Sequence, residues 1–175
     1  EAAVDAGEAE ALGVCNFSVA ALRHLLSLRP KVLPCVNQVE RHPRCPQWEL
    51  IEYCAAQRIV VQAHSPFAHG HEWLMRHAIV VKVASEARMT PAQVLIQWNL
   101  RHHVVVAPKC STESHARDIL EAASGASPML TPSQMKWLDS ITPPGAKMRR
   151  CVNPPYMWKP GPQGRHYGWD KSDNS

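Results

Sequence analysis

The stretch TPAQVLIQWNLRHHVVVAPK at residues 90–109 decides the fold, because it places a capped helix directly before a short apolar strand. Thr90 can cap the helix, a proline fills its first turn, and Gln93 can reach back to the cap amide. The unbroken apolar run at 104–108 predicts a strand of a buried parallel sheet. The helix residues expected to face the core are Val94, Leu95 and Trp98.

The same alternation of strand and helix extends over the rest of residues 1–142. Three further apolar runs predict strands at 12–17, 34–40 and 59–64. Alternating strands and helices favour βα units around a parallel sheet. The sequence predicts the end of a helix at 2–11 and further helices at 18–28, 72–88 and 131–141. Other helices are expected to start at Pro46, to follow Thr90, and to run from Ser111 or Thr112 to about Ala123.

Length and charge restrict the class of protein. The chain has 175 residues, whereas a complete eight-stranded β/α barrel needs roughly 200–250. An apolar fraction of 45% is typical of a globular chain, so one domain with a core is expected. The net charge of +4 is modest and Arg149-Arg150 is the only adjacent basic pair, which argues against a nucleic-acid partner. No run of 18 apolar residues exists, so no membrane span is expected.

Cysteines and histidines are numerous, but their spacing predicts neither disulfides nor a metal site. The six cysteines, at 15, 35, 45, 54, 110 and 151, include no C-x-x-C pair, which favours a reducing intracellular compartment such as the cytosol or an organelle matrix or stroma. Four histidines fall within residues 64–77, yet no H-E-x-x-H pattern is present. These histidines are therefore expected in loops and on the surface, and no metal ligand is predicted.

The two ends of the chain differ from its middle. The first residue is Glu1 rather than methionine, so we expect either a removed presequence or a longer product. From residue 143 to 175, prolines and glycines are mixed with aromatic residues, which excludes a regular helix or a central strand. We predict an extended arm that packs against another protein chain; the alternative is an arm that covers its own domain. The expected anchors are Tyr156, Trp158, Tyr167 and Trp169.

Five short blocks occur in the order and at the spacing in which the aldo-keto reductases carry theirs. They are Gly13–Phe17, Asn37–Pro43, Ala63–Phe67, Thr90–Trp98 and Ala107–Cys110. By these blocks the first 142 residues resemble the second half of the aldo-keto reductase barrel, its strands five to eight. The resemblance implies an α/β fold: an incomplete, half β/α barrel of the TIM type, with about four parallel strands and outer helices, followed by the extended tail. It also implies NADP(H) at the carboxyl ends of the strands.

In that family, polar side chains of the first two blocks hold the nicotinamide carboxamide. The matching positions are Cys15, Asn16 and Gln38. Asparagine and glutamine each offer a donor and an acceptor to an amide, whereas the Cys15 thiol, in place of a serine, is a weaker partner. Asn16 can equally be a strand-end residue that satisfies a loop amide.

The third block would contact the nicotinamide ring and the pyrophosphate. The family's stacking tyrosine is His64 here, which offers less area and can carry a charge. Ser65 and Phe67 match positions that contact the pyrophosphate. The segment between them and Trp73 is short, so the loop that closes over the cofactor is expected to be reduced.

The family binds the 2′-phosphate and the adenine through the pattern K-S-x-x-x-x-R-x-x-x-N. Lys109 is retained as a point charge, but the serine is Cys110 and the arginine is His115. The adenine-contacting asparagine is Ile119. An arginine fork binds two phosphate oxygens at once, which a neutral histidine cannot do. These exchanges predict weak or lost NADP(H) binding with little discrimination against NADH.

The catalytic Asp, Tyr, Lys and His of the family come from its first four strands, and no block of this chain matches them. No catalytic residue is therefore predicted, and the chain alone is expected to be inactive. Two functions stay open: a non-catalytic structural or accessory subunit of a larger assembly, or one piece of an NADPH-dependent aldehyde or ketone reductase whose missing half comes from another chain or a longer precursor. Either one requires a protein partner, because half a barrel has open strand edges and apolar faces.

Overall fold

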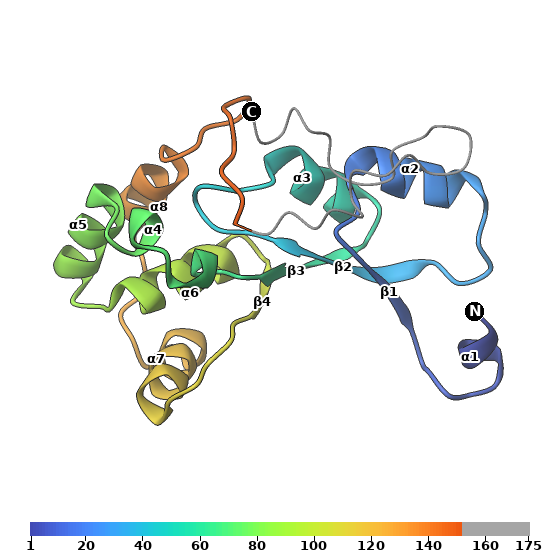
Figure 1. The fold of residues 1–175 in the computed structure, drawn as a ribbon, viewed down its shortest axis with the longest axis horizontal. Helices are drawn as coiled ribbons and strands as arrows, with labels where there is room; N and C mark the ends of the chain where they lie inside the picture. The colour runs from blue at the N-terminus through green and yellow to red at the C-terminus, as the bar shows by residue number, and fades with distance from the viewer. Residues whose placement is uncertain (152–175) are drawn as a thin grey trace.

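The computed structural model describes residues 1–151, which form an α/β fold around one parallel sheet (Figure 1). Its strands are β1 (Leu12–Cys15), β2 (Pro34–Glu40), β3 (Val60–His64) and β4 (Val105–Ala107). Each strand pairs in parallel with the next one along the chain, so the sheet order is β1-β2-β3-β4. The four predicted parallel strands are confirmed.

Helices precede, connect and follow the strands. They are α1 (Ala2–Asp5), α2 (Val19–Ser27), α3 (Trp48–Ala56), the 3-10 helix η1 (Ala68–Gly70), α4 (Glu72–Met75), α5 (Ala78–Ala87), α6 (Pro91–Arg101), α7 (Glu113–Ser124) and α8 (Pro132–Asp139). Hydroxyl caps set the starts of α2, α6, α7 and α8. At α6 the predicted capping box is confirmed, because Thr90 accepts the Gln93 N–H and the Gln93 side chain accepts the Thr90 N–H.

The segment predicted as one helix at 72–88 is in fact two helices, α4 and α5. The chain leaves the helical path at His77, whose Nδ1 accepts the N–H of Ile79 and so caps α5 (3.3 Å). Two other helices are shorter than predicted. α3 starts after Gln47, whose backbone is left-handed (φ 58°), and α1 ends at Asp5.

One face of the sheet packs against α2 and α3, which lie side by side above it in Figure 1. Strand side chains alternate between the two faces, so Val39, Val61 and Ala63 point toward these helices and are at most 5% exposed. The helix residues that complete this core are Leu22, Leu50 and Cys54.

The opposite face of the sheet has no such cover among the described residues. Val60 and Val105 on this face are 48% and 46% exposed. The rows that cross it are Gly13–Val36–Val60 and Cys15–Gln38–Gln62–Val105. A Cβ at position 13 would collide with the Val36 side chain, so the close approach of β1 to β2 requires glycine there. A closed barrel turns this face inward, so the four strands make a partial barrel whose inner face is open.

A second core forms where α5, α6 and α8 pack together. Trp98 of α6 is fully buried within it, and Val94 and Leu95 are buried as predicted. Arg41, just after β2, places its guanidinium 4.0 Å from the Trp98 ring centre and donates a hydrogen bond to Asn99 Oδ1 (2.6 Å). This buried cation joins the carboxyl end of the sheet to the second core.

Asp139, the last residue of α8, fastens that helix to α6. Its Oδ1 accepts a hydrogen bond from Trp98 Nε1 (2.8 Å) and pairs with His102 Nε2 (2.9 Å). Burial alone would raise the pKa of Asp139, but the bonds from His102 and Trp98 outweigh it and hold that pKa below its ordinary value.

Asn37 on β2 fixes the segment that follows β1. Its side chain is fully buried, its Oδ1 accepts the N–H of Phe17 (3.3 Å), and its Nδ2 donates to the Phe17 carbonyl (2.9 Å). Both backbone polar groups of Phe17 are therefore satisfied by one side chain.

Residues 143–151 return to the carboxyl end of β2. The Arg149 N–H donates to the Arg44 carbonyl (2.7 Å), and the Cys151 N–H donates to the Glu40 carboxylate (2.6 Å). This first part of the tail contacts its own domain, whereas the four predicted aromatic anchors lie outside the described residues. None of the helices within residues 1–151 combines the length and the apolar character that a membrane crossing needs.

Replacing Asp139 by asparagine is expected to lower the free energy of unfolding by about 1–2 kcal/mol at neutral pH, because a charged acceptor shared by two donors is lost. A depressed carboxylate pKa stabilises the folded chain above the ordinary value of 3.8, and this contribution is lost as the pH falls below it. Urea unfolding should therefore show a difference that shrinks in acid. Asp5→Asn, which removes an exposed ion pair, is the control and should change little. A difference independent of pH would contradict the role of Asp139.

Asn37→Ala is expected to destabilise the fold by about 1–3 kcal/mol, because both backbone groups of Phe17 lose their partner. Hydrogen exchange at the Phe17 amide should quicken more than exchange in α6. Gln57→Ala, which removes an exposed amide side chain just after α3, serves as the control. Unchanged exchange at Phe17 would show that Asn37 does not hold this segment.

Candidate functional site

A cavity of about 680 Å³ opens at the carboxyl ends of β3 and β4. Its walls come from the segment after β3, the segment after β4 and the first turns of α7. The lining residues are His64, Ser65, Pro66, Phe67, His69, Gly70, Met75, Ala92, Ala107, Lys109, Ser111, His115, Asp118 and Ile119. Five of the nine predicted cofactor residues therefore lie together here, namely His64, Ser65, Phe67, Lys109 and His115.

The segment after β3 makes a tight turn that forms one wall. Ser65, Ala68 and His69 all have left-handed backbones, with φ of 50°, 47° and 56°. The Ala68 N–H donates to the Ser65 carbonyl and the Gly70 N–H to the Phe67 carbonyl, both at 2.8 Å. The turn leads at once into η1 and α4, so the short loop predicted from the sequence is a compact, hydrogen-bonded wall.

Polar side chains form a chain of hydrogen bonds along this wall. His64 Nε2 lies 3.2 Å from Asn16 Oδ1, and His64 Nδ1 lies 3.0 Å from Ser65 Oγ, which His69 Nε2 also contacts (2.9 Å). Burial lowers the pKa of His64 below its ordinary value, so the ring is neutral at physiological pH. A neutral imidazole donates through one nitrogen and accepts through the other, which suits it to link Asn16 with Ser65.

Asn16 was open to two interpretations, an amide holder or a residue that satisfies a loop amide. Its side-chain oxygen contacts the His64 ring, and the loop amide of Phe17 is bound by Asn37 instead. The Asn16 backbone is left-handed (φ 59°), a conformation that asparagine tolerates better than most residues. Its strand-end geometry therefore directs the amide toward the cavity wall.

Cys15 and Gln38 lie outside the cavity, on the open face of the sheet. The Cys15 thiol is 3.9 Å from Gln38 Oε1, and the Gln38 amide donates to Gln62 Oε1 on β3. Burial raises the pKa of the Cys15 thiol, so it stays protonated at neutral pH. In this arrangement the Gln38 side chain is engaged by neighbouring strands.

The side of the cavity formed by α7 and the segment before it combines charges of both signs. Lys109 lines it with an exposed side chain, and Thr112 caps α7 by accepting the His115 N–H (3.2 Å). Cys110 is exposed and does not line the cavity, whereas Ser111 does. Asp118 brings a carboxylate into the same wall, where it accepts a hydrogen bond from Thr90 Oγ1 (3.2 Å).

Three polar lining residues, His69, Ser111 and Asp118, are not among the residues predicted from the sequence. Asp118 follows His115 by three positions on α7, and residues at this spacing share one face of a helix. That signal was present in the sequence. His69 and Ser111 lie in irregular segments, whose side-chain directions no periodicity gives.

The cavity can hold an anion and an apolar ring, but no tyrosine within residues 1–151 lines it. Tyr53 lies on α3, under the guanidinium of Arg23 (5.4 Å from the ring centre), within the helix layer that covers the sheet. Its hydroxyl therefore belongs to the side of the sheet away from the open face.

Comparisons with known proteins identify the family to which this arrangement belongs. Residues 1–74 match the model of the aldo/keto reductase family. A glyoxal reductase of Bacillus subtilis is 40% identical over 107 residues, which cover 61% of this chain and 38% of the relative. A glycerol 2-dehydrogenase (NADP(+)) of Saccharomyces cerevisiae is 38% identical over 104 residues, 59% of this chain and 33% of the relative.

The fold gives the same relationship. MGS-M4, an aldo-keto reductase enzyme from a deep-sea metagenome library of the Medee basin, superposes with a TM-score of 0.74 at 28% identity, covering 89% of this chain and 57% of that one. The chain spans less than half the length of the curated relatives it matches, 42%, 46% and 33% for three of them. Sequence blocks, family model and fold agree, and the chain belongs to the aldo-keto reductase family, of whose barrel it corresponds to about half.

Proposed function

We propose that this chain is a non-catalytic accessory subunit of the aldo-keto reductase family, which binds the adenosine-phosphate part of a nicotinamide dinucleotide weakly and assembles with other protein chains. The observation that carries the proposal is the cavity at the ends of β3 and β4, because it gathers five residues that match cofactor positions of the family. Its volume of about 680 Å³ is in the range of small-molecule sites, which run roughly 300–1,000 Å³.

The charges of the cavity support weak binding with little preference between dinucleotides. Lys109 offers one positive charge to a phosphate. Asp118 opposes a 2′-phosphate through its own negative charge, whereas a free ribose hydroxyl can donate to a carboxylate. His115 has no guanidinium fork, so a second strong phosphate contact is missing.

The residues that line the cavity also support our proposal that this subunit does not catalyse carbonyl reduction. Carbonyl reduction needs a proton donor within hydrogen-bond reach of the carbonyl oxygen. No tyrosine lines the cavity, and Tyr53, the one tyrosine within residues 1–151, belongs to the helix layer. We therefore assign this chain binding rather than turnover.

Assembly with other chains is proposed from the open face and edges of the sheet. β1 and β4 each have one unpaired edge in the described part of the chain, and Val60 and Val105 are half exposed between them. Such edges and faces are normally covered. Exposed thiols at Cys15, Cys35 and Cys110 fit a reducing intracellular compartment, which we propose as the location.

A second candidate function is one piece of an NADPH-dependent aldehyde or ketone reductase. The specific observation in its favour is the joined set Asn16, His64 and Ser65, which lies at the strand ends beside Lys109, where a complete barrel would bring its other strands. Under this alternative a complementary half would supply the proton donor.

Dinucleotide binding tests the first proposal. Calorimetric titration is expected to give weak binding of NADPH and NADH, with a preference below about tenfold. His115→Arg should strengthen NADPH binding by about 1–3 kcal/mol, because a charge-assisted phosphate contact forms. His103→Arg, at the amino end of β4, is the matched control and should leave binding unchanged. Submicromolar binding with strong selectivity for NADPH in the wild type would overturn the proposal.

Turnover separates the two functions. The purified chain should show no NADPH-dependent reduction of 4-nitrobenzaldehyde, since losing a positioned acid removes about 10²–10⁴ in rate. The same assay is then run with an added half barrel, the four amino-terminal βα units of the Bacillus subtilis glyoxal reductase. Activity that appears only in the mixture supports the piece of a reductase, and activity of the chain alone contradicts both functions.

A further inference from the structure

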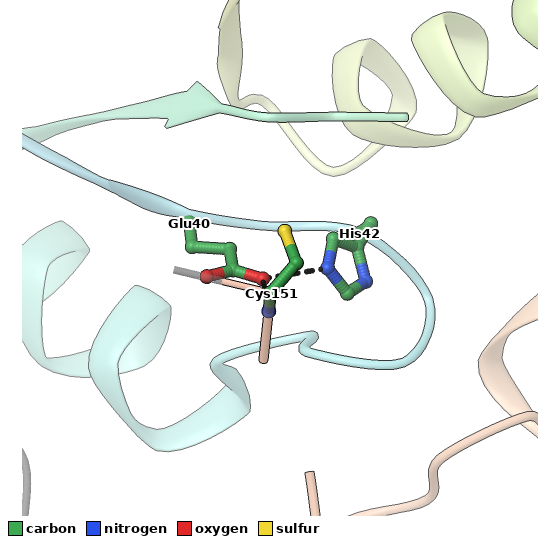
Figure 2. A group of neighbouring side chains, drawn as sticks. All are labelled: Glu40, His42 and Cys151. Atoms are coloured by element: carbon green, nitrogen blue, oxygen red, sulfur yellow. Dashed lines mark hydrogen bonds and ion pairs between the residues drawn. The ribbon is translucent and has the colours of Figure 1, made fainter. Parts of the chain in front are cut away.

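Three ligand-type side chains meet at the carboxyl end of β2, outside the cavity. Glu40 and His42 face each other with Oε1 and Nε2 2.9 Å apart, and Figure 2 shows the Cys151 sulfur beside both. The three side-chain ligand atoms lie within 4.8 Å of one another. Glu40 and His42 are at most 1% exposed, and Cys151 is partly buried.

A tight turn holds this group in place. The His42 N–H donates to the Cys45 carbonyl (3.3 Å) and the Cys45 N–H donates to the His42 carbonyl (2.7 Å). The buried Cys45 thiol lies 3.7 Å from the Glu40 carbonyl oxygen. The turn therefore fixes the backbone at His42, whose imidazole faces the Glu40 carboxylate.

We propose that Glu40, His42 and Cys151 bind a zinc ion, with a water molecule in the fourth position. Carboxylate, imidazole and thiolate are the ligand types of zinc, at about 2.0–2.3 Å from the metal. Tetrahedral ligands at these distances are about 3.4–3.8 Å apart. The three ligand atoms already lie within 4.8 Å of one another, so small movements bring them to these separations. The side chains of Glu40 and His42 are buried, and that of Cys151 is partly buried.

Protons and charges balance at this site. Ligation releases the thiol proton of Cys151 to solvent. The hydrogen on His42 Nε2 moves to Nδ1, an atom with no hydrogen-bond partner among the described residues, so no bond opposes that tautomer. A carboxylate and one thiolate balance the two positive charges of the zinc ion, so the site carries no net charge.

The proposed zinc site is not formed by the family-matched blocks alone. Glu40 and His42 belong to the block at 37–43, but Cys151 lies beyond residue 142 and reaches them through the returning segment 143–151. The simpler alternative is a buried carboxylate–imidazole pair with the thiol packed against it. Zinc ligation makes the difference measurable, because only a metal turns Cys151 into a thiolate ligand.

Cobalt(II) is the probe, since its thiolate complexes absorb in the near ultraviolet and its tetrahedral complexes absorb strongly in the visible. The reduced full chain should bind one cobalt with both absorptions, and zinc should displace it. Cys151→Ser should weaken binding by more than about 100-fold, beyond what the loss of a supporting residue costs. The control Cys110→Ser removes an exposed thiol and should bind like the wild type. No thiolate absorption in the wild type, or equal absorption in Cys151→Ser, overturns the proposal.

A second measurement needs no variant, in case Cys151→Ser does not fold. Zinc-edge X-ray absorption of the zinc-loaded wild-type chain should show sulfur at about 2.3 Å and nitrogen or oxygen at about 2.0–2.2 Å. A shell of nitrogen and oxygen alone, or zinc that a mild chelator removes at once, overturns the site.

Discussion

The burial of one cation, Arg41, on the face of Trp98 is the interaction on which the rest of the structure depends. The guanidinium lies 4.0 Å from the indole ring centre and donates to Asn99 and to the Pro46 carbonyl (3.1 Å). A buried charge without partners would cost several kcal/mol, so these contacts have to form together. They fix the end of β2 against α6, and both the cavity at β3 and β4 and the Glu40 group are built on that junction.

The sequence could predict the elements that depend on apolar periodicity and on helix capping. The strand runs, the capping box at Thr90 and the core positions Val94, Leu95 and Trp98 follow from local chemistry and periodicity, and the structure confirms them. The break near His77 depends on a side chain that turns back to its own helix, and apolar periodicity does not register it. The meeting of Cys151 with Glu40 joins segments 111 residues apart, which no spacing rule connects.

At the candidate site, too, some features could be predicted from the sequence and others could not. Lys109, His64 and Ser65 line one cavity, because the ends of neighbouring strands fix their positions. Gln38, another predicted cofactor residue, has its amide in the open face, where it donates to Gln62 of the neighbouring strand. The direction of a side chain on a strand depends on the pleat of the sheet and on its cross-strand partners. A sequence motif contains information on neither.

The strict chain order of the sheet has a consequence for how the protein is made. Every strand pairs with its immediate predecessor, so the sheet can grow in the order in which the ribosome delivers it. The contacts of Gly13 with Val36 and of Asn37 with Phe17 lie within residues 1–40, so they need no later part of the chain. The outer edge of β1 has no partner strand among the described residues. A strand that pairs with this edge would extend the sheet and keep the edge from pairing with other chains during folding, when open edges promote aggregation.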